Sequence, residues 1–303
     1  MKQSAAVRER KRQANKDGPE LTMQEILRTE GAKFSPKQRI LVDFLHRNYQ
    51  KVAFMNIGEL ARETKVSQAT IVRLADMLKF GGYPGLQKAV QRIVAQELTT
   101  MDRLQLARQA NPQDDSASKL LELEMRNISR LSQRIAKEDV NLLCAQLVDA
   151  RRVVVLGLMA SSPLAMYFGY ELNRVLPHVT TLTEDNMAAK RAICEIGSRD
   201  LLVACGFARY PAAVMRFLRV AGEKRAQRWV ITDTSASPLV RHAEHCVFVP
   251  SEIWSFVDFV AAPLTFLAWI VAGVVKREPE LTARRLQEFE TMAAEFELFH
   301  HGD

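Results

Sequence analysis

Residues 56–78 read NIGELARETKVSQATIVRLADML, and this stretch decides how the N-terminal part of the chain folds. Asn56 followed three residues later by Glu59 is the pattern of a capping box, which starts a helix. Ser67 is a favoured N-cap residue and caps a second helix. Lys65 stands at the turn, where glycine is commoner. The stretch therefore predicts two short helices joined by a tight turn.

The apolar positions of this stretch are spaced so that the two helices pack on each other. Ala61 is small enough for a close helix crossing, and Val66 is the apolar residue just after the turn. Ile71 and Leu74 then recur at helical spacing on one face of the second helix. This pattern is typical of a helix-turn-helix.

The positions that face away from Ile71 and Leu74 are candidates for contacts to DNA, because the second helix of this motif enters the major groove. Arg73 suits a guanine edge and Gln68 an adenine edge, whereas hydroxyls and lysines suit phosphates. A small helical bundle with a solvated polar face is the alternative that spacing alone leaves open. The predicted DNA-binding residues are Lys65, Ser67, Gln68, Ala69, Thr70, Arg73 and Lys79.

Charge is distributed unevenly along the 303 residues. Residues 1–92 hold 18 Lys and Arg against 9 Asp and Glu, a net charge of +9, whereas residues 93–303 hold 24 against 26, a net charge of −2. A basic segment joined to a nearly neutral one indicates a polyanion-binding N-terminal domain attached to a second, separate domain. A basic surface without such a partner is the alternative.

The residue pattern of the sequence changes after Arg152, where short runs of β-branched residues begin to alternate with helical stretches. Strands separated by helices predict a parallel sheet with helices on both faces. The expected fold class is therefore α/β, a five-stranded parallel sheet, preceded by an all-α helix-turn-helix domain. The predicted strands are residues 153–156, 179–182, 201–204, 229–232 and 246–249.

Composition also sets the expected domain boundaries. The first twenty residues are charged throughout and lack the apolar stretch of a signal peptide, so a flexible basic tail is predicted. Residues 111–116 are polar and contain proline, which is typical of a linker. The expected division is a tail at 1–20, a helix-turn-helix domain at 21–108, a linker at 109–118 and an α/β domain at 119–303.

The stretch at 256–275 is twenty residues long and mostly apolar, which is the length of a membrane span. It contains Asp258 and Pro263, and a charge within the hydrocarbon is costly. A buried packing helix is therefore the better prediction. The four cysteines are far apart and form no CxxC pair, which favours neither a disulfide nor a zinc site. We expect a cytoplasmic protein without metal, cofactor or membrane partner.

One pattern runs through four stretches of the N-terminal part: 34–37 (FSPK), 56–61 (NIGELA), 66–74 (VSQATIVRL) and 80–86 (FGGYPGL). Across about residues 22–100 it resembles the DNA-binding domain of the RpiR family of bacterial transcriptional regulators. The resemblance implies a winged or extended helix-turn-helix that works as a homodimer or homotetramer on a palindromic operator in double-stranded DNA.

Members of that family carry a sugar-isomerase-type (SIS) domain, and residues 120–275 resemble it in the order and spacing of their strands. The first loop of the family's domain is usually G-x-G-x-S. Gly157 and Ser161 match this pattern, while Met159 stands in place of the second glycine. The resemblance implies that Ser161 and Ser162, at the start of a helix, hold an anion.

The second loop departs most from the family, whose S-x-S-G-x-T cradle wraps a sugar phosphate. Here the loop at 206–211 reads GFARYP, so all three hydroxyls are lost. Arg209 offers a guanidinium, which pairs bidentately with a carboxylate or a phosphate. We therefore expect a small acidic metabolite, such as a sugar phosphate or a carboxylate, near Gly206, Arg209 and Tyr210. A structural salt bridge or a subunit contact of Arg209 is the alternative.

The third loop, ITDTSASPL at 231–239, closely matches the corresponding stretch of the family. Its hydroxyls at Thr232 and Ser235 are expected to line the same site. Glu252 follows the last predicted strand and is expected to close the site.

The SIS fold also houses isomerases, so a sugar-phosphate isomerase with a basic N-terminal appendage is the alternative function. Isomerisation needs a positioned base, but His242 and His245 precede the last strand, where surface or packing roles explain them better. We therefore assign no catalytic residue. A regulator whose α/β domain only joins subunits is a further alternative. The expected subunit contacts are the helix at 256–275 and the helices flanking 117–149.

Overall fold

The computed structural model describes residues 34–53, 55–97, 99–101, 104, 116–235, 237–251 and 260–299. The chain divides into two compact units, Met1–Arg103 and Leu104–Asp303, and each unit has hydrophobic clusters of its own. The predicted basic tail at 1–20 and most of the predicted linker lie outside the described residues.

The first unit consists, in its described part, of helices α3 (Pro36–Val52), α4 (Ile57–Thr64), α5 (Gln68–Met77) and α6 (Tyr83–Glu97). Local signals set where these helices begin and end. The capping box predicted at the start of α4 is present, because Glu59 N donates to Asn56 Oδ1 over 2.9 Å and Asn56 N donates to Glu59 Oε2 over 2.7 Å. After α5, Gly81 and Gly82 take positive φ angles of 66° and 94°, which helical backbone does not allow.

The second unit is built on a five-stranded sheet with the order β2-β1-β3-β4-β5. Every neighbouring pair of strands is parallel. The strands are β1 (Val153–Gly157), β2 (Val179–Leu182), β3 (Leu201–Cys205), β4 (Gln227–Thr232) and β5 (His245–Phe248). All five predicted strands are confirmed to within two residues at each end, and so is the α/β fold class.

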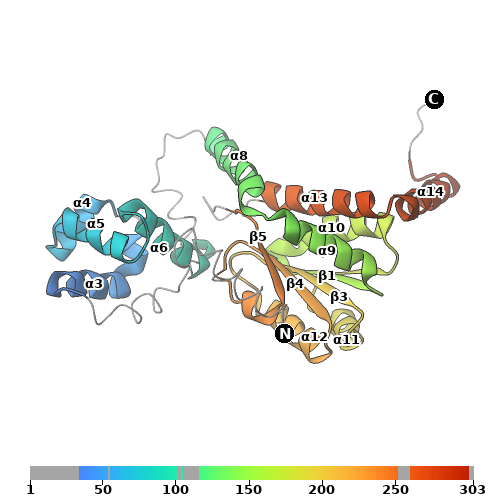
Figure 1. Ribbon diagram of the computed structural model, residues 1–303, viewed down its shortest axis with the longest axis horizontal. Coiled ribbons are helices and arrows are strands. Elements are labelled where there is room, and N and C mark those ends of the chain that lie inside the picture. Colours follow the sequence, from blue (N-terminus) through green and yellow to red (C-terminus); the bar gives the residue numbers. More distant parts are fainter. Residues whose placement is uncertain are drawn as a thin grey trace. The chain divides into compact units, whose positions relative to one another are not determined.

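Helices cover both faces of this sheet, which explains why β1 and β3 are buried along their whole length. On one face lie α9 (Lys137–Asp149), α10 (Ser162–Val175) and α13 (Ala261–Arg277), and on the other lie α11 (Met187–Cys194) and α12 (Ala212–Glu223) (Figure 1). Two more helices pack on this layer: α8 (Ser116–Arg134) on α13 and α14 (Pro279–Glu295) on α10. Short 3-10 turns stand at Met159–Ser161 and Val240–His242.

The described part of the apolar stretch that resembled a membrane span, from residue 260 onward, packs inside the second unit. It belongs to α13, whose Phe266, Leu267 and Ile270 are fully buried. Glu124 Oε1 of α8 accepts a hydrogen bond from Ala261 N at the start of α13, over 3.1 Å. Within the described ranges, no helix combines the length and the apolar character that crossing a membrane requires. The predicted packing helix is thus confirmed from Ala261 onward.

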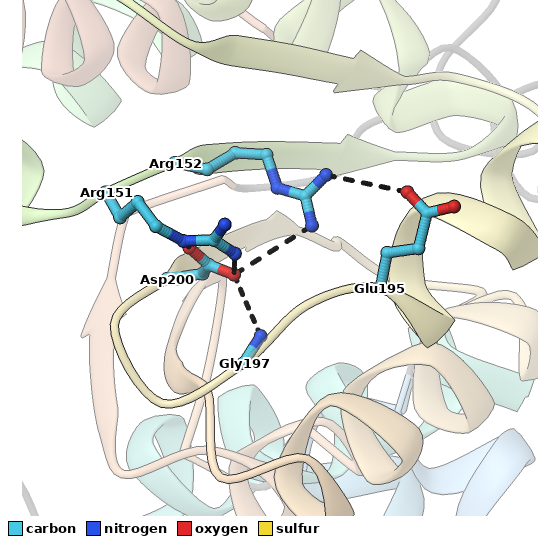
Figure 2. A network of polar contacts seen from close by, with 5 residues as sticks. All are labelled: Arg151, Arg152, Glu195, Gly197 and Asp200. Atoms are coloured by element: carbon cyan, nitrogen blue, oxygen red, sulfur yellow. Dashed lines mark hydrogen bonds and ion pairs between the residues drawn. The ribbon is translucent and has the colours of Figure 1, made fainter.

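A polar network ties the amino ends of β1 and β3 together (Figure 2). Asp200, which is buried, accepts hydrogen bonds from Arg151 Nε over 2.9 Å and from Arg151 Nη2 over 2.7 Å. Gly197 N donates to the same carboxylate over 2.8 Å, and Arg152 lies 3.9 Å from it. This network stands at the opposite edge of the sheet from the loops that follow β1 and β3, so we assign it to stability.

Replacing Asp200 with asparagine should destabilise the second unit by about 2–3 kcal/mol at neutral pH, because it removes a charged acceptor from a bidentate pair. Burial alone raises the pKa of Asp200, but hydrogen bonds from Arg151 and Gly197 N, with the nearby Arg151 and Arg152 charges, outweigh it and lower the pKa. A lowered carboxyl pKa stabilises the fold above the unfolded value of about 3.9, and this contribution disappears as the pH falls through the folded value.

Urea unfolding followed by tryptophan fluorescence measures this effect, since all three tryptophans fall within residues 104–303. The difference between the wild type and Asp200→Asn should be full at pH 6–8 and should shrink below about pH 4. Glu195→Gln is the matched control, because exposed Glu195 forms a long ion pair with Arg152, over 3.9 Å. Equal stabilities of wild type and Asp200→Asn at pH 7 would contradict the assignment.

Candidate functional site

The outer face of α5 is the first candidate site. Ile71, Leu74 and Ala75 are buried against α3, α4 and α6, as the helical spacing predicts. The opposite side of α5 is open to solvent, because α3, α4 and α6 all pack on its inner side. Its exposed residues are Gln68, Ala69, Val72, Arg73 and Asp76, and Thr70 is partly exposed.

Two lysines mark the ends of this helix. Lys65 at the end of α4 has a φ angle of 53°, and Lys79 beyond α5 has a φ angle of 63°. Both therefore take the left-handed conformation that glycine adopts most readily. The predicted turn position of Lys65 is confirmed, and both side chains are exposed near the face of α5.

Ser67 stands at the N-cap of α5, but the predicted side-chain cap is wrong. Its hydroxyl makes no hydrogen bond to the helix backbone, and Ser67 Oγ lies instead 2.9 Å from Thr70 Oγ1. The two hydroxyls satisfy each other at the beginning of the helix, next to exposed Gln68 and Ala69. The seven residues predicted to bind DNA therefore lie together on or beside one exposed or partly exposed helix face.

Val72 and Asp76 are exposed on the same face and are not among the seven residues predicted to bind DNA. Helical spacing would have found both, since they follow Gln68 by one and by two turns. They were overlooked because an aliphatic or acidic residue is not an obvious partner for a polyanion.

The second candidate site is the carboxyl edge of the sheet, where β1, β3 and β4 end. Gly157 pairs with Cys205, and Cys205 with Ile231, so the loops that follow these three strands lie side by side. The chain turns to one face after β1, into α10, and to the other face after β3, into α12. Doubly wound sheets bind ligands at such a switch point.

The loop after β1 is closely packed. A Cβ atom at Gly157 would lie 2.4 Å from Ser161 O and 2.8 Å from the Ala165 side chain, so only glycine fits there. Met159 is exposed and has a φ angle of 53°, the conformation that a glycine would adopt without strain. Ser161 is buried and Ser162 is partly exposed at the first turn of α10.

The loop after β3 carries aromatic and cationic groups. A Cβ at Gly206 would lie 2.2 Å from Leu239 Cδ1, so the third loop packs directly over this position. Arg209 is exposed with a φ angle of 66°, and Ala208 is buried. Tyr210 is half-buried, and its hydroxyl donates a hydrogen bond to Asp233 Oδ1 over 2.6 Å.

Asp233 joins the second and third loops. The hydroxyl of fully buried Thr232 also donates to Asp233 Oδ1, over 3.1 Å. Ser235, two residues after Asp233, is partly exposed. Burial and the adjacent Asp233 charge raise the pKa of Tyr210, so its phenol keeps its proton and remains a donor. The structure thus brings Tyr210 and Thr232 to one carboxylate, and Glu252 lies outside the described residues.

None of the histidines in the described part of the second unit stands at this carboxyl edge. His178 precedes β2, and His245 opens β5, where its ring stacks on Trp229 with centroids 4.6 Å apart. His242 lies in the turn before β5, and its pKa is lowered by burial first and then by the charges of nearby arginines. These positions agree with packing and surface roles.

Comparison with known families identifies both units. Residues 21–97 match the helix-turn-helix domain of the rpiR family, and residues 146–272 match the SIS domain. Together the two matches span about two thirds of the chain. Among curated proteins, YfhH of Escherichia coli K12, an uncharacterised HTH-type transcriptional regulator, is 24% identical over 74% of this chain and 79% of its own length. A second such regulator, CPE0189 of Clostridium perfringens, is 21% identical over 70% of this chain and 76% of its own length.

Solved structures agree on the fold. The sugar isomerase domain of an RpiR transcription factor from Sphaerobacter thermophilus is similar to 59% of this chain and 99% of its own, with a TM-score of 0.57 and 21% identity. The Vibrio vulnificus NanR protein, solved with ManNAc-6P, is similar to 91% of this chain and 99% of its own, with a TM-score of 0.57 and 19% identity. The chain therefore belongs to the RpiR family of helix-turn-helix transcriptional regulators that carry a C-terminal SIS domain.

Proposed function

We propose that this cytoplasmic regulator binds a palindromic operator as a homo-oligomer, and that a small acidic metabolite at the carboxyl edge of its sheet modulates operator affinity. The observation that carries the DNA-reading part is the outer face of α5, where Gln68, Ala69 and Arg73 are exposed while Ile71 and Leu74 are buried. Phosphate-binding groups, namely the two lysines and two hydroxyls, stand at its ends.

Arg209 supports an acidic effector. The loop after β3 has no Ser or Thr at its positions 206, 208 and 211, so a phosphate wrapped by hydroxyls is disfavoured here. NanR was solved with a sugar phosphate, and a carboxylate or a phosphate reached by a guanidinium keeps the same sign of charge with a different set of donors. The ligand shifts operator affinity if it binds the second unit more tightly in one arrangement of the two DNA-binding domains than in another.

Helix α8 supports a second copy of the chain as the partner subunit. Leu123 and Leu131 are buried on this helix, which packs on α13, but Leu121, Met125 and Ile128 form an exposed apolar stripe at helical spacing. We call these three residues the α8 stripe. A two-fold axis would place the same stripe of two chains together, which makes the surface self-complementary. A palindromic operator demands the same two-fold symmetry.

The test of the whole proposal is binding of the full-length protein to a duplex that it selects from a random pool. Specific binding should weaken steeply with salt, because phosphate contacts release counterions. Weak binding of equal strength to every duplex would refute it. In that case, turnover of aldose and ketose phosphates without DNA, followed by NMR, would decide for the sugar-phosphate isomerase.

Replacing Arg209 with alanine should weaken effector binding about tenfold or more, because a charge-assisted pair contributes about 1.5–3 kcal/mol. The effector is first found as the sugar phosphate or small carboxylic acid that raises the Tm of the wild type. Saturating ligand stabilises a protein by about 2.7 kcal/mol at 100 times its Kd. Arg225→Ala is the matched control, since Arg225 is also exposed, with a φ angle of 62°, but stands before β4 at the other edge of the sheet.

Two results would count against the effector site. A full Tm shift in Arg209→Ala would exclude Arg209 from binding and favour its role in a salt bridge or subunit contact. A flat response of the wild type to the whole panel would favour an α/β domain that only joins subunits.

A further inference from the structure

Val72 is an exposed aliphatic side chain in the middle of the α5 face. Val72 retains 37% of its accessible surface. Of its two neighbours in the chain, apolar Ile71 is buried in the core and charged Arg73 is exposed, as expected for their residue types. Gln68 lies one turn before Val72 and Asp76 one turn after it, and both are exposed. Val72 therefore occupies the centre of the face that the structure leaves open.

Neither the helix nor the core of the first unit accounts for this residue. Valine forms helices less readily than alanine because its branched Cβ loses rotamer freedom against the preceding turn. Val72 is also absent from the buried cluster that holds α3 to α6 together. Its methyl groups gain free energy only when another molecule covers them.

The chemistry of the major groove offers one apolar group for such a contact. Only thymine carries a C5-methyl there, and apolar side chains recognise it by direct contact. We propose that Val72 reads a thymine methyl in each half-site, between the bases that Gln68 and Arg73 reach. This inference rests on the proposed function and adds a specificity-determining residue to it.

The test is a double-mutant cycle between the protein and the selected operator. Thymines are replaced by deoxyuridine one symmetric pair at a time, which deletes only the C5-methyl, and affinities of wild type and Val72→Ala are compared. At one pair of positions the wild type should lose about fourfold per half-site, or about fifteenfold for two, as expected for exposing one methyl group in each. Val72→Ala should lose less than twofold there, because the contact is already gone.

Two further variants guard this result. Val72→Thr keeps the branched shape with one methyl and should fall between the wild type and the alanine variant. Ile40→Ala removes an aliphatic side chain that is 52% exposed on α3, a different helix, and should lose as much as the wild type at that pair. Val72→Ala is expected to fold, since alanine favours the helix and the site is exposed.

Equal losses for wild type and Val72→Ala at every thymine pair would overturn the assignment, and so would a wild type that is insensitive to all the substitutions. Both outcomes leave the DNA-binding proposal intact, because specific binding is measured first. Failure of the wild type to prefer any duplex would instead refute the proposed function itself.

Discussion

Replacing Arg73 with alanine should lower affinity for the selected operator by about thirtyfold or more. A bidentate arginine–guanine pair discriminates by about 1–3 kcal/mol, and a palindrome holds two of them. Affinity for a scrambled duplex should fall much less, because that binding comes from phosphates and many charges share it. Fluorescence anisotropy with both duplexes over a range of salt concentrations gives the specificity ratio directly.

Arg191→Ala is the control for this experiment. It removes the same charge from an exposed position on α11, in the second unit. Its specificity ratio should equal that of the wild type. If Arg73→Ala kept the wild-type ratio of operator to scrambled binding, the orientation of α5 toward the bases would be wrong.

Replacing Met125 with glutamate should dissociate the proposed homodimer. Met125 is 70% exposed at the centre of the α8 stripe, and burying a methionine at an interface contributes about 1.5–3 kcal/mol. A symmetric dimer loses the Met125 side chain of both subunits, and two glutamate charges of the same sign face each other in their place. We expect the dimer dissociation constant to rise by about a hundredfold or more, as measured by analytical ultracentrifugation.

Operator affinity should also fall in this variant as dimerisation weakens, because two DNA-binding domains joined in a dimer bind with a high effective concentration. Met166→Glu is the matched control, since Met166 is 60% exposed on α10, outside the α8 stripe. A Met125→Glu protein that still sediments as the wild type would remove α8 from the interface. Dissociation by Met166→Glu alone would move the interface to α10.

Local interactions explain why much of this protein is predictable from its sequence. The Asn56–Glu59 capping box is complete within four residues, and Gly81-Gly82, at positive φ angles, keeps the backbone between α5 and α6 out of the helical region. The five strands are recognisable because each is a short run of branched and apolar residues between turn residues. The outward face of α5 follows from helical periodicity once Ile71 and Leu74 are placed inward.

Contacts across the chain are what the sequence did not reveal. The hydrogen bond of Tyr210 to Asp233 joins residues 23 positions apart, and the pair of Arg151 with Asp200 joins residues 49 positions apart. Glu124 reaches Ala261 N across 137 positions. Each of these partners depends on which strands and helices are neighbours. Even Ser67, a favoured N-cap residue, bonds to Thr70 Oγ1 in place of the backbone.

The sequence by itself determined the two-part architecture, the recognition helix and the loops at which a ligand is expected. Helical periodicity, helix caps and the order of the strands along the chain all depend on residues that are close together in the sequence. Only the tertiary structure decided that Tyr210 and Thr232 share the Asp233 carboxylate, that Leu239 fills the space over Gly206, and that Val72 stays uncovered. Those features depend on how side chains from distant segments fill space around each other, and no local pattern records that packing.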